Sequence, residues 1–166
     1  MKEAIFTGSG VAIVTPFQDG AVNFPVFRRL IERQIAEGTD AIIVCGTTGE
    51  AATMTQKERM ETIAYCVDRV AGCVPVIAGT GANDTQVARE NALAAERLGV
   101  DGLLIVTPYY NKATQQGLLR HYEVIAVAEI ITRNLDVEVR EGSASSLRSE
   151  ERRVGKECRS RWSPYH

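Results

Sequence analysis

The feature that most constrains the fold is a repeat of short apolar runs, each followed by a helix-like segment. The four runs read GVAIVTP, DAIIVCG, VPVIAGTG and DGLLIVTP, and each ends in glycine, threonine or proline. Their starts lie near residues 11, 41, 74 and 102, so the pattern recurs every 28 to 33 residues. Continuous apolar runs are typical of strands in parallel sheets that helices cover. The repeat therefore predicts four βα units.

A helix is predicted after each of these strands. Asn23 can cap the first helix, and Thr55 with Glu58 can form the capping box of the second. The third helix is predicted over residues 85–98 and the fourth over residues 115–127. The apolar stripes expected to face the sheet are Phe27, Leu30, Ile31 and Ile35; Met60, Ile63, Ala64, Val67 and Val70; Ala88, Ala92, Ala95 and Leu98; and Leu118, Tyr122, Ile125 and Ala126.

Two architectures accept a run of four βα units with right-handed crossovers. One is an open doubly wound sheet, and the other is half of a (β/α)₈ barrel. The spacing of the units does not distinguish between them.

The βα pattern stops near residue 128. The segment LRSEERRVGKECRSRWSPYH is rich in charge and has no hydrophobic period, so it is not expected to pack. It reads like translated cloning or adapter sequence, or a shifted reading frame, and is excluded from fold reasoning. We therefore predict one domain over residues 1–128 and an irregular, non-native tail over residues 129–166.

Composition excludes several classes of function. Hydrophobic residues make up 45% of the chain and charged residues 24%, as in ordinary globular proteins. A net charge of -2 offers no footprint for nucleic acid. No run approaches a membrane span, and the N-terminus has no apolar signal region, so we expect a cytoplasmic protein. The four cysteines show no metal-ligand spacing and are read as reduced thiols.

Ligands of parallel α/β folds bind outside the carboxyl ends of the strands. The residues at those ends are Thr15 and Pro16, followed by residues 46–50, 79–83 and 107–111. GTTGE lacks the lysine and spacer of a phosphate-binding P-loop, and GTGAND lacks the third glycine of a dinucleotide fingerprint. GTTGE could also be a plain turn, with glycines supplying unusual backbone angles and threonines capping the next helix.

The segment TPYYN favours a chemical site. Of its two adjacent tyrosines, we expect only one to join the hydrophobic packing, which leaves the other to present a phenol at the strand end. A tyrosine hydroxyl can carry a proton, and a threonine hydroxyl can pass it on. Alternatively, both tyrosines pack at a subunit interface, where this residue type is favoured.

Together, TGSGVAIVTPF, GTTGEAATM, PVIAGTGAN and TPYYN resemble the N-terminal half of the 4-hydroxy-tetrahydrodipicolinate synthase (dihydrodipicolinate synthase) family. The resemblance covers roughly residues 5–127. The related N-acetylneuraminate lyases rank second, because they usually have serine in place of Thr47 and lack TPYY.

The resemblance implies a (β/α)₈ barrel of the class I aldolase type, here truncated to about four units. Family members are lyases that work as homodimers or homotetramers and open the lysine (diaminopimelate) biosynthesis pathway. Pyruvate forms a Schiff base with a barrel lysine, and the resulting enamine attacks L-aspartate 4-semialdehyde. The resemblance implies no metal and no organic cofactor.

Three residues match catalytic positions of the family. Thr47 resembles the threonine of the proton relay, and Tyr110 resembles the relay tyrosine that reaches across a tight dimer interface into the partner's site. Thr48 resembles the residue that binds the pyruvate carboxylate through its hydroxyl and amide.

Three further residues, Ala52, Asn83 and Tyr109, resemble positions around the pocket for the inhibitor lysine at the same interface. Val87 stands where inhibited bacterial enzymes often have a glutamate. The resemblance therefore puts lysine feedback in doubt, because an acidic partner for the effector's ammonium group is missing.

The family's third relay tyrosine, in a YNVPSRTG-like motif, has no counterpart after the fourth predicted helix. The only lysines are Lys2, Lys57, Lys112 and Lys156, and none of them lies on a predicted strand. We therefore expect the chain as written to be inactive. Two other hypotheses stand beside this one: a non-catalytic α/β module that binds a small anion, and a misassembled reading-frame product without a function of its own.

Overall fold

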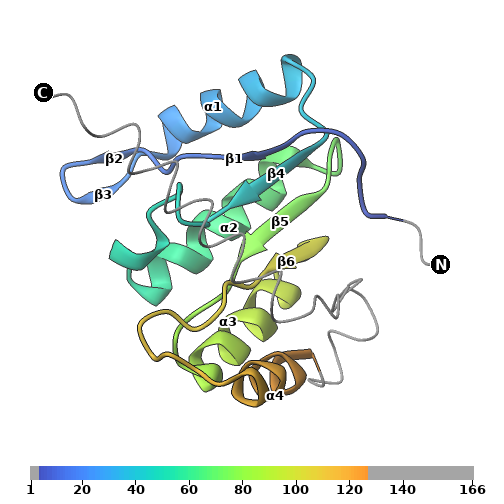
Figure 1. The fold of residues 1–166 in the computed structure, drawn as a ribbon. Helices are drawn as coiled ribbons and strands as arrows, with labels where there is room; N and C mark the ends of the chain where they lie inside the picture. Colours follow the sequence, from blue (N-terminus) through green and yellow to red (C-terminus); the bar gives the residue numbers. More distant parts are fainter. Residues whose placement is uncertain (1–3, 127–166) are drawn as a thin grey trace, which may run out of the picture.

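The computed structural model describes residues 4–126, and Figure 1 shows their arrangement. Four parallel strands form one sheet in the order β1-β4-β5-β6. These strands are β1 (Gly10–Ala12), β4 (Ala41–Val44), β5 (Val76–Gly79) and β6 (Gly102–Leu104). A helix follows each strand along the chain, namely α1 (Phe24–Ala36), α2 (Gln56–Val70), α3 (Thr85–Arg97) and α4 (Gln115–Ala126).

The order of the strands selects between the two predicted architectures. Sequence neighbours are also sheet neighbours throughout, with Gly10 opposite Ala41, Ile42 opposite Val76, and Ile77 opposite Gly102. A doubly wound sheet would reverse direction at a switch point, whereas a barrel adds each new strand beside the last. The described part is a run of barrel units, with β1 and β6 as its two edges.

The predicted helix starts are confirmed. The side chain of Asn23 accepts a hydrogen bond from the amide of Val26 at 3.1 Å and caps α1. Thr55 and Glu58 form a complete capping box before α2. The side chain of Asp84 accepts hydrogen bonds from two amides at the start of α3. These caps satisfy helix amides that would otherwise lack partners.

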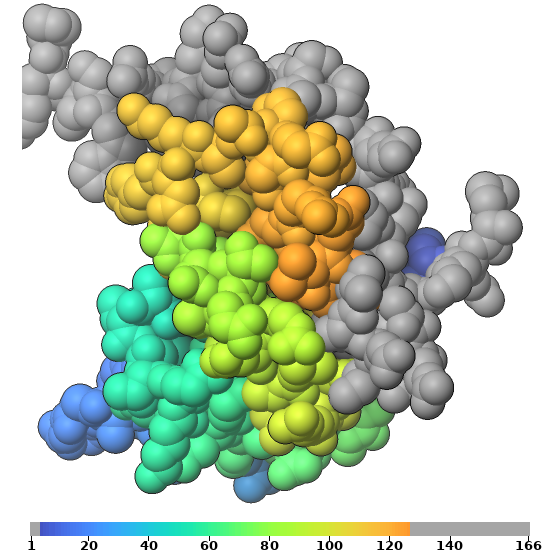
Figure 2. Space-filling view, turned by 90° about the horizontal axis from the view of Figure 1, so that it is seen from below, coloured from blue at the N-terminus to red at the C-terminus, as the bar shows by residue number. Residues whose placement is uncertain are grey.

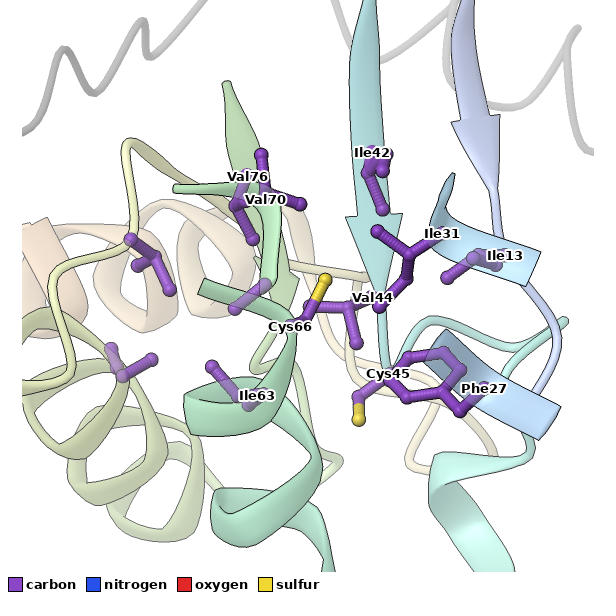
Figure 3. Packing of buried hydrophobic residues seen from close by; sticks show 14 of the residues in the cluster. Ile13, Phe27, Ile31, Ile42, Val44, Cys45, Ile63, Cys66, Val70 and Val76 are labelled. Atoms are coloured by element: carbon purple, nitrogen blue, oxygen red, sulfur yellow. The ribbon is translucent and has the colours of Figure 1, made fainter. Parts of the chain in front are cut away.

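The hydrophobic core lies between the sheet and the helices. Figure 3 shows Ile42, Val44 and Val76 of the sheet packed against side chains of α1 and α2, including Ile31 and Cys66. These side chains are at most 2% exposed. The predicted stripes are confirmed at Phe27, Ile31, Ile63, Val70, Ala88, Ala92, Ala95 and Ile125, which are fully buried, and their other members are partly buried.

The other face of the sheet is only partly covered. We call it the open face, and its side chains come from the alternate residues Ala12, Val14, Ile43, Ile77, Leu104 and Val106. Val14, Leu104 and Val106 are 48%, 44% and 41% exposed. Ile5 and Phe6 lie against its N-terminal end, where Gly102 and Gly10 leave room for them.

Two local features differ from the sequence prediction. A short antiparallel pair, β2 (Phe17–Gln18) and β3 (Ala21–Val22), precedes α1 and was not predicted. Each of its strands has only two residues, too few to show an alternating pattern. The first strand ends at Ala12, although the apolar run continues to Pro16. The predicted tail over residues 129–166, Lys2, Lys156 and position 127 of the fourth helix lie outside the described residues.

Figure 2 shows α4 packed beside α3 on the surface of the molecule. The hydroxyl of Thr85 on α3 lies 2.9 Å from Nδ1 of His121 on α4, and His121 is 3% exposed. None of the helices within residues 4–126 is both long and apolar enough to cross a bilayer.

Candidate active site

Three strand-end loops meet at the carboxyl edge of the sheet because glycines let their backbones approach. A Cβ atom on Gly79 would overlap the carbonyl oxygen of Cys45 and lie 2.9 Å from the Cα atom of Gly46. A Cβ atom on Gly81 would lie 2.6 Å from the amide nitrogen of Val106. The loops after β4, β5 and β6 therefore lie side by side, as the sequence predicted.

The loop over residues 46–50 is a tight turn with a buried anchor. The amide of Gly49 donates to the carbonyl of Gly46 at 3.1 Å, and the amide of Glu50 donates to the carbonyl of Thr47 at 3.0 Å. The buried hydroxyl of Thr15 donates to the carbonyl of Gly49 at 2.8 Å. Sequence reasoning placed Thr15 at this edge but did not foresee its role as a support for the neighbouring loop.

The positive backbone angles of this turn do not fall on its glycines. Cys45 and Glu50 have φ angles of 54° and 56°, in the left-handed region that is unfavourable for residues with a Cβ atom. The interpretation that the glycines supply unusual φ angles was therefore wrong. Gly46 and Gly49 serve close packing instead, because a Cβ atom on Gly49 would lie 3.1 Å from the amide nitrogen of Cys45.

Thr47 and Thr48 are exposed at the tip of this turn. Within residues 4–126, neither their amides nor their hydroxyls form a hydrogen bond. They do not cap the next helix either, because Thr55 does. The turn therefore presents two free amides and two free hydroxyls, a set of donors suited to an anionic oxygen.

Cys45, at the base of the turn, is not suited to be a nucleophile. Its thiol is 1% exposed, and burial raises its pKa to about 12. The thiol is therefore protonated at neutral pH, whereas a reactive cysteine needs its thiolate. The chemistry available at this turn comes from the threonines.

The loop after β6 holds Tyr110 in a strained conformation. Tyr110 and Lys112 have φ angles of 65° and 48°. Between them, Asn111 donates through Nδ2 to the carbonyl of Asn83 at 2.8 Å, which ties this loop to the one after β5. Non-glycine residues in such conformations persist where the surrounding contacts hold them, and they often mark functional sites.

The two tyrosines are not divided between core and surface as expected. Tyr110 is 94% exposed and Tyr109 is 45% exposed, so neither is part of the core. Their rings meet edge to face with centroids 6.1 Å apart. The expectation that one would join the hydrophobic packing was therefore wrong, because both residues lie in the loop beyond β6, where Tyr110 has a positive φ angle.

The predicted effector-pocket residues Ala52, Asn83 and Tyr109 are all exposed. Ala52 lies in the short helix η1 (Ala51–Thr53), and Asn111 joins the loops that carry the other two. Val87 is 44% exposed on α3. Sequence reasoning missed Arg59, whose charge lies near Tyr109 and whose pKa is lowered by burial. An arginine within a helix has no local sequence pattern that predicts its burial or its contact with a distant loop.

The lysines within the described residues lie away from the sheet. Lys57 is exposed in the first turn of α2, with its Nζ atom 3.7 Å from a carboxylate oxygen of Glu61. Lys112 is exposed in the loop after β6. No group of three or more metal-ligating side chains occurs between residues 4 and 126.

The sequence profile of the dihydrodipicolinate synthetase family matches residues 5–136. The chain belongs to this family. Among curated members, the 4-hydroxy-tetrahydrodipicolinate synthase of Clostridium tetani is 57% identical over 122 residues, which are 74% of this chain and 42% of that protein.

Solved family members share the fold. The dihydrodipicolinate synthase of Aquifex aeolicus matches with a TM-score of 0.72 and 49% identity over 73% of this chain and 41% of that chain. The chloride-inhibited enzyme of Acinetobacter baumannii, complexed with pyruvate, matches with a TM-score of 0.72 and 48% identity over 74% of this chain and 42% of that chain. These matches confirm the barrel class and the family resemblance.

The matched region spans less than half the length of these relatives. The family's barrel has eight strands, and the described residues hold four of its βα units. The strand-end loops described here are therefore one part of the strand-end surface of a complete family barrel.

Proposed function

We propose that this chain forms one wall of the active site of a 4-hydroxy-tetrahydrodipicolinate synthase, which condenses pyruvate with L-aspartate 4-semialdehyde through a lysine Schiff base. The observation that carries the proposal is the turn over residues 46–50, where Thr47 and Thr48 present free amides and hydroxyls at the carboxyl edge of a family barrel. Curated relatives that share this part of the chain carry the synthase name.

Thr48 is proposed to hold the carboxylate of pyruvate. A carboxylate accepts hydrogen bonds only, and hydrogen bonds to a charged acceptor are stronger than those between neutral groups. The free amide and hydroxyl of Thr48 supply two donors from one residue. The buried bond from Thr15 to Gly49 keeps the turn in place, so these donors need little reorganisation when the substrate arrives.

Thr47 and Tyr110 are proposed to move protons during the condensation. Forming a Schiff base and an enamine requires protons to leave and return, and hydroxyl groups can both accept and donate them. Tyr110 is 94% exposed on a loop fixed by Asn111. An exposed tyrosine held in this way suits a group that enters the site of a second subunit, so the complete enzyme is proposed to be a homodimer or homotetramer.

The chain by itself is proposed to lack activity. Covalent catalysis of this type needs an amine whose pKa is lowered by burial or by neighbouring charge. Lys57 and Lys112 are exposed and lie on a helix and a loop. Supply of the Schiff-base lysine is therefore assigned to the part of the family's barrel that the match does not cover.

A chimera tests the proposed site. Residues 1–126 of this chain replace the matching part of the Clostridium tetani relative, and condensation of pyruvate with aspartate semialdehyde is measured. We expect an active chimera, with Thr47→Val and Tyr110→Phe each lowering kcat by about 10²-fold or more, the usual contribution of proton transfer groups. Thr48→Val should mainly raise the KM for pyruvate.

Thr39→Val is the matched control, because it removes a threonine hydroxyl at the opposite end of the strands, where Thr39 bonds to Ser9 and Ala41. Its kcat should stay close to that of the unmodified chimera. An inactive but folded chimera, or equal losses at Thr39 and Thr47, would contradict the proposed roles.

Borohydride reduction in the presence of pyruvate tests the inactivity of the chain alone. The chimera should gain one reduced pyruvate adduct, detected by mass spectrometry, and the isolated chain should gain none. An adduct on the isolated chain would contradict the assignment of the lysine. Pyruvate binding without an adduct would instead favour the anion-binding module, because binding needs only the donors of the turn.

A further inference from the structure

The open face of the sheet and its two edge strands form a surface that a second copy of this chain can complete. We propose that two copies close one eight-stranded barrel around a two-fold axis that runs parallel to the strands. In this assembly β6 of each copy pairs with β1 of the other. The proposal concerns assembly and does not depend on the proposed catalysis.

The direction of the strands permits this closure. All four strands are parallel and follow one another in the order β1-β4-β5-β6, so both edges point the same way. A two-fold rotation about the strand direction keeps every strand parallel. It brings the β1 edge of each copy beside the β6 edge of the other. Eight strands is also the number at which side chains just fill the interior of a barrel. A closed two-fold arrangement leaves no strand edge unpaired.

The chemistry of the surface also favours contact with itself. The strands and their continuations read GVAIVT, AIIVCG, VIAGT and GLLIV and contain no charged residue. Contact between two such surfaces therefore brings no like charges together. Neither β1 nor β6 carries the lysine, proline or inward charge that commonly protects an edge strand from association.

The most exposed apolar side chains of the open face lie along its two edges. Val14 follows β1 and is 48% exposed, whereas Leu104 and Val106, at the end of β6 and just beyond it, are 44% and 41% exposed. In the two-copy barrel, Val14 of one copy lies next to the β6 edge of the other copy. The same closure therefore pairs the edges and buries the apolar side chains that the single copy leaves in water.

Sedimentation equilibrium of the full 166-residue chain tests the proposal without pyruvate. The expected species has twice the 18.1 kDa mass of one chain. Leu104→Glu should shift it to one copy, because the variant places two charges inside the closed barrel. Val87→Glu is the matched control, since Val87 is 44% exposed on α3, the helix that follows the interior strand β5, and this variant should remain a pair. Far-UV circular dichroism checks that both variants are folded.

A single-copy mass for the unmodified chain at all concentrations would overturn the proposal. A series of masses beyond two copies would also overturn it, because it would mean that the edges associate without closing. Equal dissociation by Leu104→Glu and Val87→Glu would point to another interface.

Thiol crosslinking tests the geometry without relying on a destabilising change. Val14→Cys and Val106→Cys are made in separate chains in which Cys73 and Cys158 are serine, and the two chains are refolded together. A short crosslinker should join the mixed pair and stop at two copies, whereas Val14→Cys alone should give no dimer, since two-fold closure separates the two copies of β1. Crosslinking within Val14→Cys alone, or none in the mixture, contradicts the closed barrel.

Discussion

Adjacent residues of β5 meet two different environments. Val76 is 2% exposed and lies in the core with side chains of α2, whereas its neighbour Ile77 faces the partly covered side of the sheet. The same alternation runs through the other strands. The helix-covered face is completed by residues close in sequence, because each helix follows the strand on which it packs. The open face needs strands from elsewhere.

The difference between the faces separates what this chain can specify from what it cannot. Local βα packing gives a core with Phe27, Ile42 and Ile63 fully buried. The strand-end turn with Thr47 and Thr48 is also complete, since the hydroxyl of Thr15 supports it. A catalytic interior requires the open face to be enclosed. The fold is thus built unit by unit, whereas the proposed chemistry depends on closure of the barrel.

The largest expected effect on stability comes from removing a large side chain from the helix-covered face. Phe27→Ala should lower the free energy of unfolding by about 3–5 kcal/mol, because it leaves a large cavity in a packed core. Phe27 is fully buried on α1 and lies near Tyr65 of α2, with ring centroids 6.2 Å apart. Urea denaturation followed by far-UV circular dichroism measures the loss.

Phe17→Ala is the matched control, because Phe17 is 39% exposed in the β2–β3 pair. Its cost should stay below about 1 kcal/mol, as for most substitutions of exposed residues. Equal costs for the two phenylalanines would mean that the helix-covered face does not hold the fold together.

The next effect concerns the point where the loops meet. Gly79→Ala should destabilise the chain by about 1–3 kcal/mol, because the new methyl group meets the backbone of Cys45 and Gly46, which can only move together with the turn. Gly117→Ala on α4 should have the opposite sign and stabilise by about 0.5 kcal/mol through helix propensity. The new methyl group lies 3.3 Å from the hydroxyl of Thr114, which has to shift slightly and lowers the gain. Thermal unfolding of both variants checks the signs. A harmless Gly79→Ala would contradict the close approach of the loops.

Much of the helix-covered face could be predicted from sequence because its signals are local. Apolar stripes, the Asn23 cap and the Thr55–Glu58 capping box each arise within a few residues of chain. The four βα units and the position of the strand-end loops follow from the same periodicity. Choosing a barrel over a doubly wound sheet required the strand order from the structure. The sequence period shows where the strands are but not which strands lie side by side.

The site was predicted less completely, because its geometry depends on contacts between loops. The sequence identified the turn over residues 46–50. The alternative interpretation as a plain turn assigned its backbone angles to glycines, whereas Cys45 and Glu50 adopt the positive φ angles. It predicted that one tyrosine would pack, but the loop held by Asn111 keeps both outside the core. No local pattern marks a side chain that supports a loop from a neighbouring strand.

A smaller effect on the free energy of unfolding compares the two faces through the neighbouring residues Val76 and Ile77. Val76→Ala should cost about 2 kcal/mol, since it removes buried methyl groups and leaves a cavity in the core. Ile77→Ala removes more carbon atoms, yet it should cost about 1 kcal/mol or less under dilute conditions, because its side chain is only partly buried. The midpoints of urea unfolding compare them.

Protein concentration sharpens that test. If two copies enclose the open face, the stability cost of Ile77→Ala should rise with protein concentration. The stability cost of Val76→Ala should keep a constant part at every concentration, because Val76 packs in the core of each chain. A cost of Ile77→Ala that exceeds that of Val76→Ala in dilute solution would mean that the open face is already enclosed within a single chain.

The smallest expected effect is a pH dependence on the helix-covered side. His121 is buried between α3 and α4, where its Nδ1 lies 2.9 Å from the hydroxyl of Thr85, and burial lowers its pKa below the usual 6.5. The folded chain therefore favours neutral imidazole, and the unfolded chain binds the proton more readily. The stabilising contribution of neutral His121 is fully present above about pH 6.5 and is lost as the pH falls toward the lower folded pKa.

Unfolding free energies measured in small pH steps should decline as the pH falls across this window, and His121→Gln should flatten the decline. An unchanged slope in His121→Gln would assign the effect to another group, and rising stability on acidification would contradict the buried neutral imidazole.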